Sequence, residues 1–112
     1  MQQSDLQVFN TVPFFFWAKD ENGVYIWVNE ALKSFAKEDI IGKTDDELPW
    51  SNNAEAFQSV DLDVLNSGKP KFLHEHLGQF MNGSATLSVC KYPGEFEGKK
   101  CTFGISFIID QN

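Results

Sequence analysis

Three consecutive acidic residues in the stretch TDDELPW are the first candidates for chemistry. Asp45, Asp46 and Glu47 carry carboxylates that could bind a divalent metal ion or perform acid–base catalysis. The same stretch fits the start of a short helix, because Thr44 and Glu47 have the spacing of a capping box. Acidic side chains in a first turn also interact favourably with the helix dipole. We find no nearby residues that would complete a metal shell, so we interpret the cluster as a helix start.

Two histidines form the second candidate. His74 and His76 would point to the same side of a strand, about 6.5–7 Å apart by strand rise, with Glu75 on the other side. They could bind a metal, line a cavity, or lie exposed on an amphipathic strand. No third or fourth ligand follows at a suitable spacing, which disfavours the metal; strand parity leaves the other two readings open. No Ser, His or Cys forms a local nucleophile motif, so we expect no catalytic residue and no enzyme.

Charge and composition exclude several classes of protein. The chain carries nine lysines, no arginine and a net charge of −7, which disfavours direct binding of nucleic acid. The longest apolar run, residues 12–18, is far shorter than the roughly 20 residues of a membrane helix. Cys90 and Cys101 are too few and too far apart for a metal or redox motif. We expect a soluble, cytoplasmic chain with reduced thiols.

The order of predicted elements indicates an α+β domain. Residues 12–18 and 24–28 flank the turn DENG and predict a hairpin, after which Asn29 caps a helix over 30–36. Residues 51–70 predict a longer helix with Asn52 and Glu55 as its capping pair. Three strands follow, at 71–80, 84–93 and 100–110, joined through Asn82-Gly83 and GEFEGK.

Five stretches in this order resemble the PAS sensory domain: VPFFFWAKDENGVYIWVNEAL, DIIGKTDDELPW, DLDVLNSGKP, FLHEHL and KYPGEFEGKKCTFGISFIIDQN. The resemblance implies a five-stranded antiparallel sheet of strand order 2-1-5-4-3, with connecting helices on one face around a cavity. It places a single PAS domain at residues 12–110, an N-terminal cap segment at 1–11, and the start of a linker to an effector at 111–112. Asp110 is kept from the family's usual ending, whereas its threonine position is lost.

The resemblance also implies a function. PAS domains of this type precede sensor histidine kinases, diguanylate cyclases and helix-turn-helix transcription regulators in bacterial signalling proteins. We expect a non-catalytic sensor that binds a small ligand, dimerises, or does both to control such an effector. The alternative is a constitutive dimerisation module without a ligand.

The cofactor is unknown from the sequence. The cysteine of photoactive flavin domains is missing from GKTDDELPW, which excludes that chemistry. Residues 53–67 contain no histidine to serve as a haem ligand, which disfavours haem. A non-covalent flavin or a small organic ligand remains open.

Face parity carried over from the family predicts which residues line the cavity. The predicted set combines strand positions with the inner faces of the helices: Phe15, Trp17, Ile26, Val28, Phe35, Phe57, His74, His76, Val89, Ser106 and Ile108. Lys19 would lie at the cavity rim, Trp50 would plug the cavity, and small residues such as Gly104 would leave volume at the sheet centre.

The opposite sheet face would be strongly apolar. Its predicted residues are Phe14, Phe16, Trp27, Phe103, Ile105 and Phe107. Such a face is too large to leave in water, so it must be covered by the N-terminal segment or by a partner. We therefore expect a homodimer through this face.

Overall fold

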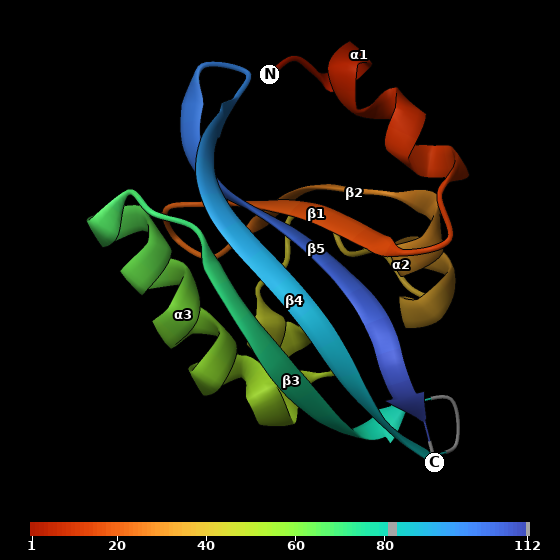
Figure 1. The fold of residues 1–112 in the computed structure, drawn as a ribbon. Coiled ribbons are helices and arrows are strands. Elements are labelled where there is room, and N and C mark those ends of the chain that lie inside the picture. Colours follow the sequence, from red (N-terminus) through yellow and green to blue (C-terminus); the bar gives the residue numbers. More distant parts are fainter. Residues whose placement is uncertain (81–82, 112) are drawn as a thin grey trace.

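The computed structural model describes residues 1–80 and 83–111, which form one antiparallel sheet with helices on both sides (Figure 1). The sheet order β2-β1-β5-β4-β3 is the one predicted from the family resemblance. The strands are β1 (Phe15–Asp20), β2 (Tyr25–Val28), β3 (Lys71–Phe80), β4 (Gly83–Phe96) and β5 (Lys99–Gln111). Asn82 and Asn112, which belong to the predicted turn and linker, lie outside the described residues.

The β1–β2 hairpin contains a bulge that changes which side chains face inward. Gly23 adopts a φ of 79°, as the DENG turn predicts. Ala18 pairs with Trp27 and Lys19 pairs with Tyr25, so Ile26 is an extra residue on β2. Tyr25 consequently packs in the inner core and Ile26 against the outer one. The prediction that Ile26 faces the cavity is therefore wrong.

Helix α2 (Glu30–Ala36) begins at Asn29, as predicted, and this residue also holds other segments. The Asn29 side-chain oxygen accepts hydrogen bonds from the backbone N–H groups of Leu32 and Phe16, both at 3.2 Å. Its amide group donates to the carbonyl oxygens of Phe9, at 2.8 Å, and Phe14, at 2.9 Å. One buried side chain thus joins α2, β1 and the N-terminal segment.

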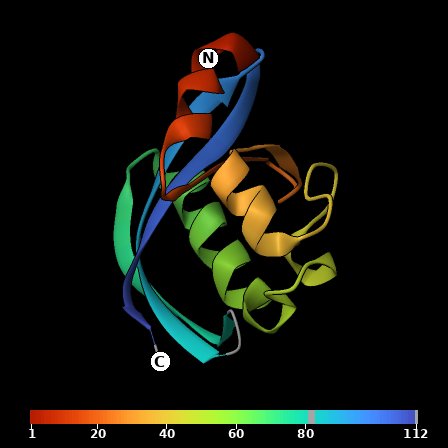
Figure 2. The same cartoon turned by 90° about the vertical axis from the view of Figure 1, so that its right-hand side faces the viewer.

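Helix α3 (Ala54–Ser67) lies with α2 on the inner face of the sheet (Figure 2). The short 3-10 helices η2 (Asp45–Glu47) and η3 (Ser51–Asn53) precede it. The predicted Asn52–Glu55 cap is wrong, because α3 begins after Asn53 and no side chain caps it. Asn53 instead donates to the carbonyl oxygen of His76 at 2.9 Å, because the η3 turn already continues into α3. Gly68 ends the helix with a φ of 70°.

The N-terminal segment covers part of the outer sheet face, as one of the two predicted alternatives. Helices α1 (Gln3–Leu6) and η1 (Gln7–Thr11) place Leu6, which is 0% exposed, and Phe9 over this face. The Phe9 and Phe16 rings stack with centroids 4.2 Å apart. The N-terminal amine reaches the β4–β5 hairpin, donating to the Glu95 carbonyl oxygen at 2.7 Å.

This cover changes the predicted dimer surface. Three of its six residues are buried within the chain itself: Phe16, Trp27 and Phe103. Their assignment to a dimer interface is therefore wrong. Phe107, which is 47% exposed, and the partly buried Phe14 and Ile105 remain accessible.

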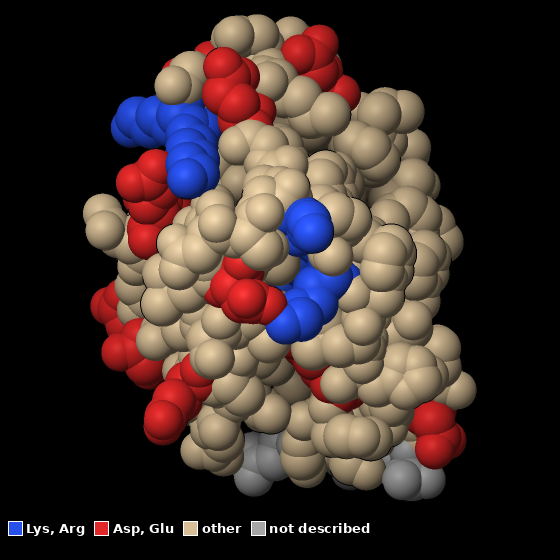
Figure 3. All heavy atoms as spheres, turned by 60° about the vertical axis from the view of Figure 1, so that its left-hand side comes forward, with Lys and Arg blue, Asp and Glu red and all other residues tan. Residues whose placement is uncertain are grey.

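The surface charges give no sign of an extended basic face on the side drawn in Figure 3, where lysines lie beside acidic groups. Exposed ion pairs such as Lys43–Glu38, at 3.0 Å, illustrate this mixture. In the described part of the chain, no helix has the length and apolarity needed to cross a membrane.

Candidate functional site

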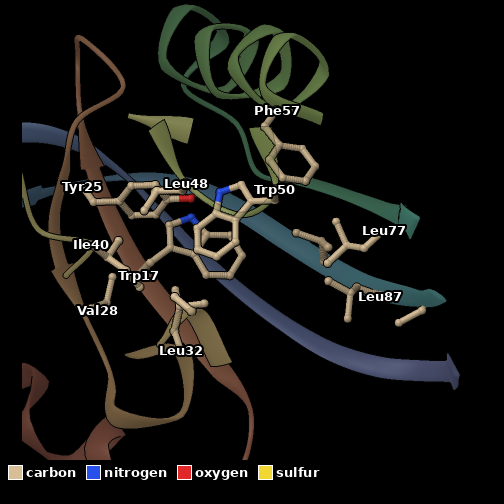
Figure 4. Packing of buried hydrophobic residues seen from close by; sticks show 13 residues of the cluster. Trp17, Tyr25, Val28, Leu32, Ile40, Leu48, Trp50, Phe57, Leu77 and Leu87 are labelled. Atoms are coloured by element: carbon tan, nitrogen blue, oxygen red, sulfur yellow. The ribbon is translucent and has the colours of Figure 1, made fainter. Parts of the chain in front are cut away.

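A small cavity of about 40 Å³ lies between the sheet and the inner helices. Its walls are aromatic and aliphatic, formed by Phe15, Trp17, Tyr25, Leu32, Phe35, Trp50, Phe57, Leu77 and Leu87. Figure 4 shows Trp17, Tyr25 and Trp50 converging beneath α3. Four polar residues complete the lining: Lys19, Glu75, Lys91 and Ser106. The site is therefore an apolar cavity with polar and charged side chains on part of its wall.

Five buried charged side chains form a continuous row beside this cavity. Lys19 Nζ lies 2.6 Å from Asp45 Oδ2 and 2.7 Å from Asp61 Oδ2. Lys91 Nζ lies 3.3 Å from Asp61 Oδ1 and 3.1 Å from Glu75 Oε2. All five residues are at most 9% exposed. Acidic and basic groups alternate along the row, which begins at Asp45 and ends at Glu75.

Asp45 lies in the first turn of η2, as predicted, but its carboxylate also has a tertiary role that was not predicted from the sequence. Tyr25 donates its hydroxyl to Asp45 Oδ1 at 2.6 Å, and the Trp50 indole nitrogen donates to the same atom at 2.8 Å. Thr44 and Glu47 form the predicted capping box around it. The capping box leaves the Asp45 carboxylate free to turn inward, where it accepts three hydrogen bonds.

Helix and strand periodicity places Asp61, Glu75 and Lys91 on the inner side of the molecule. Asp61 lies on the inner face of α3, one turn after Phe57 and three residues before Val64. Glu75 is buried on β3 while both neighbouring histidines are exposed. Lys91 continues the inward alternation of Leu87 and Val89 on β4.

Burial and the neighbouring charges shift the pKa values of three groups in the site. Burial lowers the pKa of Lys19, but the carboxylates of Asp61 and Asp45 outweigh this and raise it overall. Burial and Asp45 raise the pKa of Tyr25 well above 10.0, so the phenol keeps its proton. Burial raises the pKa of Glu75 above 4.5, although Lys91 opposes the shift.

Two cavity-lining polar atoms have no hydrogen-bond partner within the described part of the chain: Trp17 Nε1 and Ser106 Oγ. Glu75 Oε2 faces Lys91 at ion-pair distance but likewise forms no hydrogen bond there. Buried polar groups in proteins are nearly always satisfied, by protein or by another molecule. Trp17 Nε1 and Ser106 Oγ therefore mark places where a bound molecule can be recognised.

Gly104 explains the position of the Trp17 ring. A Cβ atom at Gly104 would lie 2.2 Å from the indole, so only glycine lets the ring lie against the β5 backbone. The prediction that small residues on β5 leave space here is wrong for Gly104, because Trp17 fills it.

The structure brings five of the eleven predicted residues to the cavity wall: Phe15, Trp17, Phe35, Phe57 and Ser106. Val28 and Val89 belong to the same buried core without lining the cavity. Trp50 is 7% exposed and lines it, stacked on Phe35 with centroids 5.9 Å apart, in agreement with its predicted role as a plug.

The remaining predicted residues lie elsewhere. His74 and His76 are exposed, so the cavity-lining role is wrong for both; the strand turns Glu75 inward instead. His76 Nδ1 lies 2.9 Å from Thr86 Oγ1 on the neighbouring strand. Ile108 is 43% exposed and lines an open groove of about 510 Å³ beyond the cavity.

Four members of the charged row were not predicted as site residues: Asp45, Asp61, Glu75 and Lys91. Lys19 was expected at the rim, yet it is 1% exposed. A signal existed for three of the four, because a charged residue interrupts an otherwise apolar inward pattern at Asp61, Glu75 and Lys91. For Asp45 no such signal exists.

The cavity limits which cofactors fit. Pockets for drug-sized ligands have volumes of roughly 300–1,000 Å³. A cavity of about 40 Å³ does not accommodate the three fused rings of a flavin without displacing wall residues. Among residues 1–80 and 83–111, no three His, Cys, Asp or Glu side chains are arranged to hold a metal ion. The residues present therefore fit neither a flavin nor a metal ion.

Comparison with solved structures supports the fold. A VqmA dimer of Vibrio cholerae, described as a LuxR-type receptor, aligns with a TM-score of 0.82 and 22% identity, covering 98% of this chain and 53% of VqmA. A phage VqmA–DPO complex aligns with a TM-score of 0.83 and 19% identity, covering 96% and 52%. The PAS domain of an HTR-like protein from Haloarcula marismortui aligns at 0.73 and 19%, covering 95% and 90%.

The chain thus spans about half the length of the VqmA proteins. No curated protein matches it in sequence. The family model described as PAS fold matches residues 9–102, which is most of the chain. This match, together with the sheet order and the cavity between sheet and helices, shows that the chain belongs to the PAS fold family.

Proposed function

We propose that this domain is a non-catalytic sensor that binds a small polar molecule in its cavity and thereby controls an attached effector. The observation that carries the proposal is a pair of buried polar atoms on the cavity wall, Trp17 Nε1 and Ser106 Oγ, which have no hydrogen-bond partner among the described residues. Unsatisfied polar groups are unfavourable in a packed core, because each lowers the stability by about 1–3 kcal/mol. A ligand with complementary donors and acceptors would recover that free energy.

The similar VqmA structures support the role of a ligand-binding sensor domain. One is described as VqmA bound to DPO and another as a VqmA–ligand–DNA complex. By analogy we propose that a bacterial effector, such as a transcription regulator or a sensor histidine kinase, follows this domain and that the whole protein works in the cytoplasm. The DNA contacts of such a protein would belong to the effector, because this domain carries a net charge of −7.

A constitutive dimerisation module is the second candidate, and the small cavity favours it. About 40 Å³ holds only a few water-sized groups, so the core is already well filled. The uncovered outer patch of Phe14, Ile105 and Phe107 would form the interface in either case. A monomer in light scattering at high micromolar concentration would argue against this interface.

Mass spectrometry separates the two candidates. The domain is purified, its absorption is recorded between about 300 and 500 nm, and the molecules released on denaturation are identified. A stoichiometric small molecule supports the sensor. An empty protein that dimerises, and whose dimer is unchanged by a cell metabolite extract, supports the dimerisation module.

A further inference from the structure

The buried charged row beside the cavity holds an odd number of charges. It contains two lysines against three carboxylates, so with every group ionised its net charge is −1. An uncompensated charge in a protein interior is costly, and it is removed by protonation or by a counter-charge. The row therefore lacks one positive charge.

The contacts locate this deficit at one end of the row. Asp45 accepts hydrogen bonds from Lys19, Tyr25 and Trp50. Asp61 lies between the two ammonium groups. Glu75, by contrast, has a single cationic neighbour at ion-pair distance, Lys91, which it shares with Asp61.

Among the described residues around Glu75, the only cationic side chains are Lys91 and Lys19, and both already pair with Asp61. Lys91 of β4 and Lys19 of β1 favour its ionised form, whereas Asp61 of α3 opposes it. The other ionisable group among the described lining residues is Tyr25, which stays neutral. Burial raises the pKa of Glu75 more than the lysines lower it, so the proton is held more tightly than in water.

Glu75 also lines the cavity, and aromatic rings surround that space. Ring faces attract organic cations, as the ammonium groups already present show: Lys91 Nζ lies 5.0 Å from the Phe57 ring centroid and Lys19 Nζ lies 4.9 Å from that of Tyr25. The cavity therefore offers a carboxylate and ring faces to one small occupant, beside two lysines whose charges are already paired with Asp45, Asp61 and Glu75.

We propose that the cavity selects a small organic cation, such as an amidinium or a protonated amine, whose N–H group pairs with Glu75 and supplies the positive charge that the row lacks. The inference rests on the proposed ligand-binding function and names the chemical class of the ligand.

Three probes with the same heavy-atom skeleton test the charge preference. Acetamidinium, acetamide and acetate differ in charge but hardly in size, and their binding is followed by NMR chemical shifts of the ¹⁵N-labelled domain. We expect acetamidinium to bind about tenfold more tightly than acetamide, with acetate weakest. Its affinity should fall as the pH is lowered, because a proton on Glu75 competes with the cation.

Substitutions test whether Glu75 causes the preference for acetamidinium. Glu75→Gln should bind acetamidinium no better than acetamide and should lose the pH dependence. Glu55→Gln, an exposed residue of α3, is the matched control and should behave as the wild type. Equal binding of the three probes, no binding of acetamidinium, or full binding by Glu75→Gln would each overturn the proposal.

A titration of the wild type gives an independent readout. The carboxyl ¹³C shift of Glu75 should titrate above its ordinary pKa of 4.5 in the empty protein and move lower when acetamidinium is saturating. A midpoint at or below 4.5 would contradict the raised pKa of Glu75. A neutral or anionic molecule that co-purifies with the domain would support the sensor but reject the cation, so the two proposals can fail separately.

Discussion

Replacing Asp61 by asparagine removes the central carboxylate of the buried row. Its oxygens lie 2.7 Å from Lys19 Nζ and 3.3 Å from Lys91 Nζ. At an effective dielectric constant of about 20, two unit charges about 3 Å apart attract by about 5 kcal/mol. Much of this attraction is offset by the cost of burying the charges, and breaking a buried pair by removing one partner costs about 3–5 kcal/mol.

Asp61→Asn leaves each lysine one carboxylate partner, Asp45 for Lys19 and Glu75 for Lys91. We therefore expect it to lower the free energy of unfolding by about 1–3 kcal/mol, less than a fully broken pair would. A domain of this length has a total unfolding free energy of about 6–17 kcal/mol, so the variant should still fold. With about 4 °C for each kcal/mol, its Tm should fall by about 4–12 °C. Urea unfolding followed by the fluorescence of the buried tryptophans measures the change.

The neighbouring Asp63→Asn is a matched control on the same helix. Asp63 pairs with Lys71 at the surface, where both side chains are about half exposed. Such a pair contributes less than about 1 kcal/mol. If Asp61→Asn cost no more than Asp63→Asn, the ionised row described above would be the wrong account of this core.

Two further substitutions test the packing around the sheet. Gly104→Ala should cost about 1–3 kcal/mol in urea unfolding, because the new methyl group collides with the Trp17 ring; Gly78→Ala, with open space around its Cβ position, should be nearly neutral, and similar costs for both would refute the contact. Leu6→Ala should lower the Tm and cost about 2–5 kcal/mol, because Leu6 is 0% exposed where the N-terminal segment packs on the outer sheet face. Val8→Ala, at a position 63% exposed, should leave the Tm unchanged, and an equal loss in both would show that the segment does not dock as described.

Local patterns predicted much of this fold. The β1–β2 turn depends on Gly23, the start of α2 depends on Asn29, and the inward faces of Leu87 and Val89 follow from strand alternation. Each of these features is decided by a few neighbouring residues. Together with the family resemblance they were sufficient for the sheet order and for five of the cavity residues.

The remaining features depend on tertiary contacts and strand register that no local sequence pattern specifies. The β2 bulge depends on how Lys19 and Tyr25 pair across the hairpin, and a one-residue insertion reverses the faces of the residues beside it. Asp45 is drawn inward by Lys19 and by Trp50, which no local rule connects to a capping motif. Asp61, Glu75 and Lys91 each interrupt an apolar inward pattern, but this pattern alone does not show that the three side chains meet in one row.

Asn29 has a consequence for how a signal could leave the cavity. Helix α2, which supplies Leu32 and Phe35 to the cavity wall, begins at the same side chain that binds the carbonyl groups of Phe9 and Phe14. A displacement of α2 must therefore either carry residues 9–14 with it or leave buried hydrogen-bonding groups unpaired. The inner and outer layers of the molecule are mechanically linked around the edge of the sheet, and their coupling does not require the strands to bend.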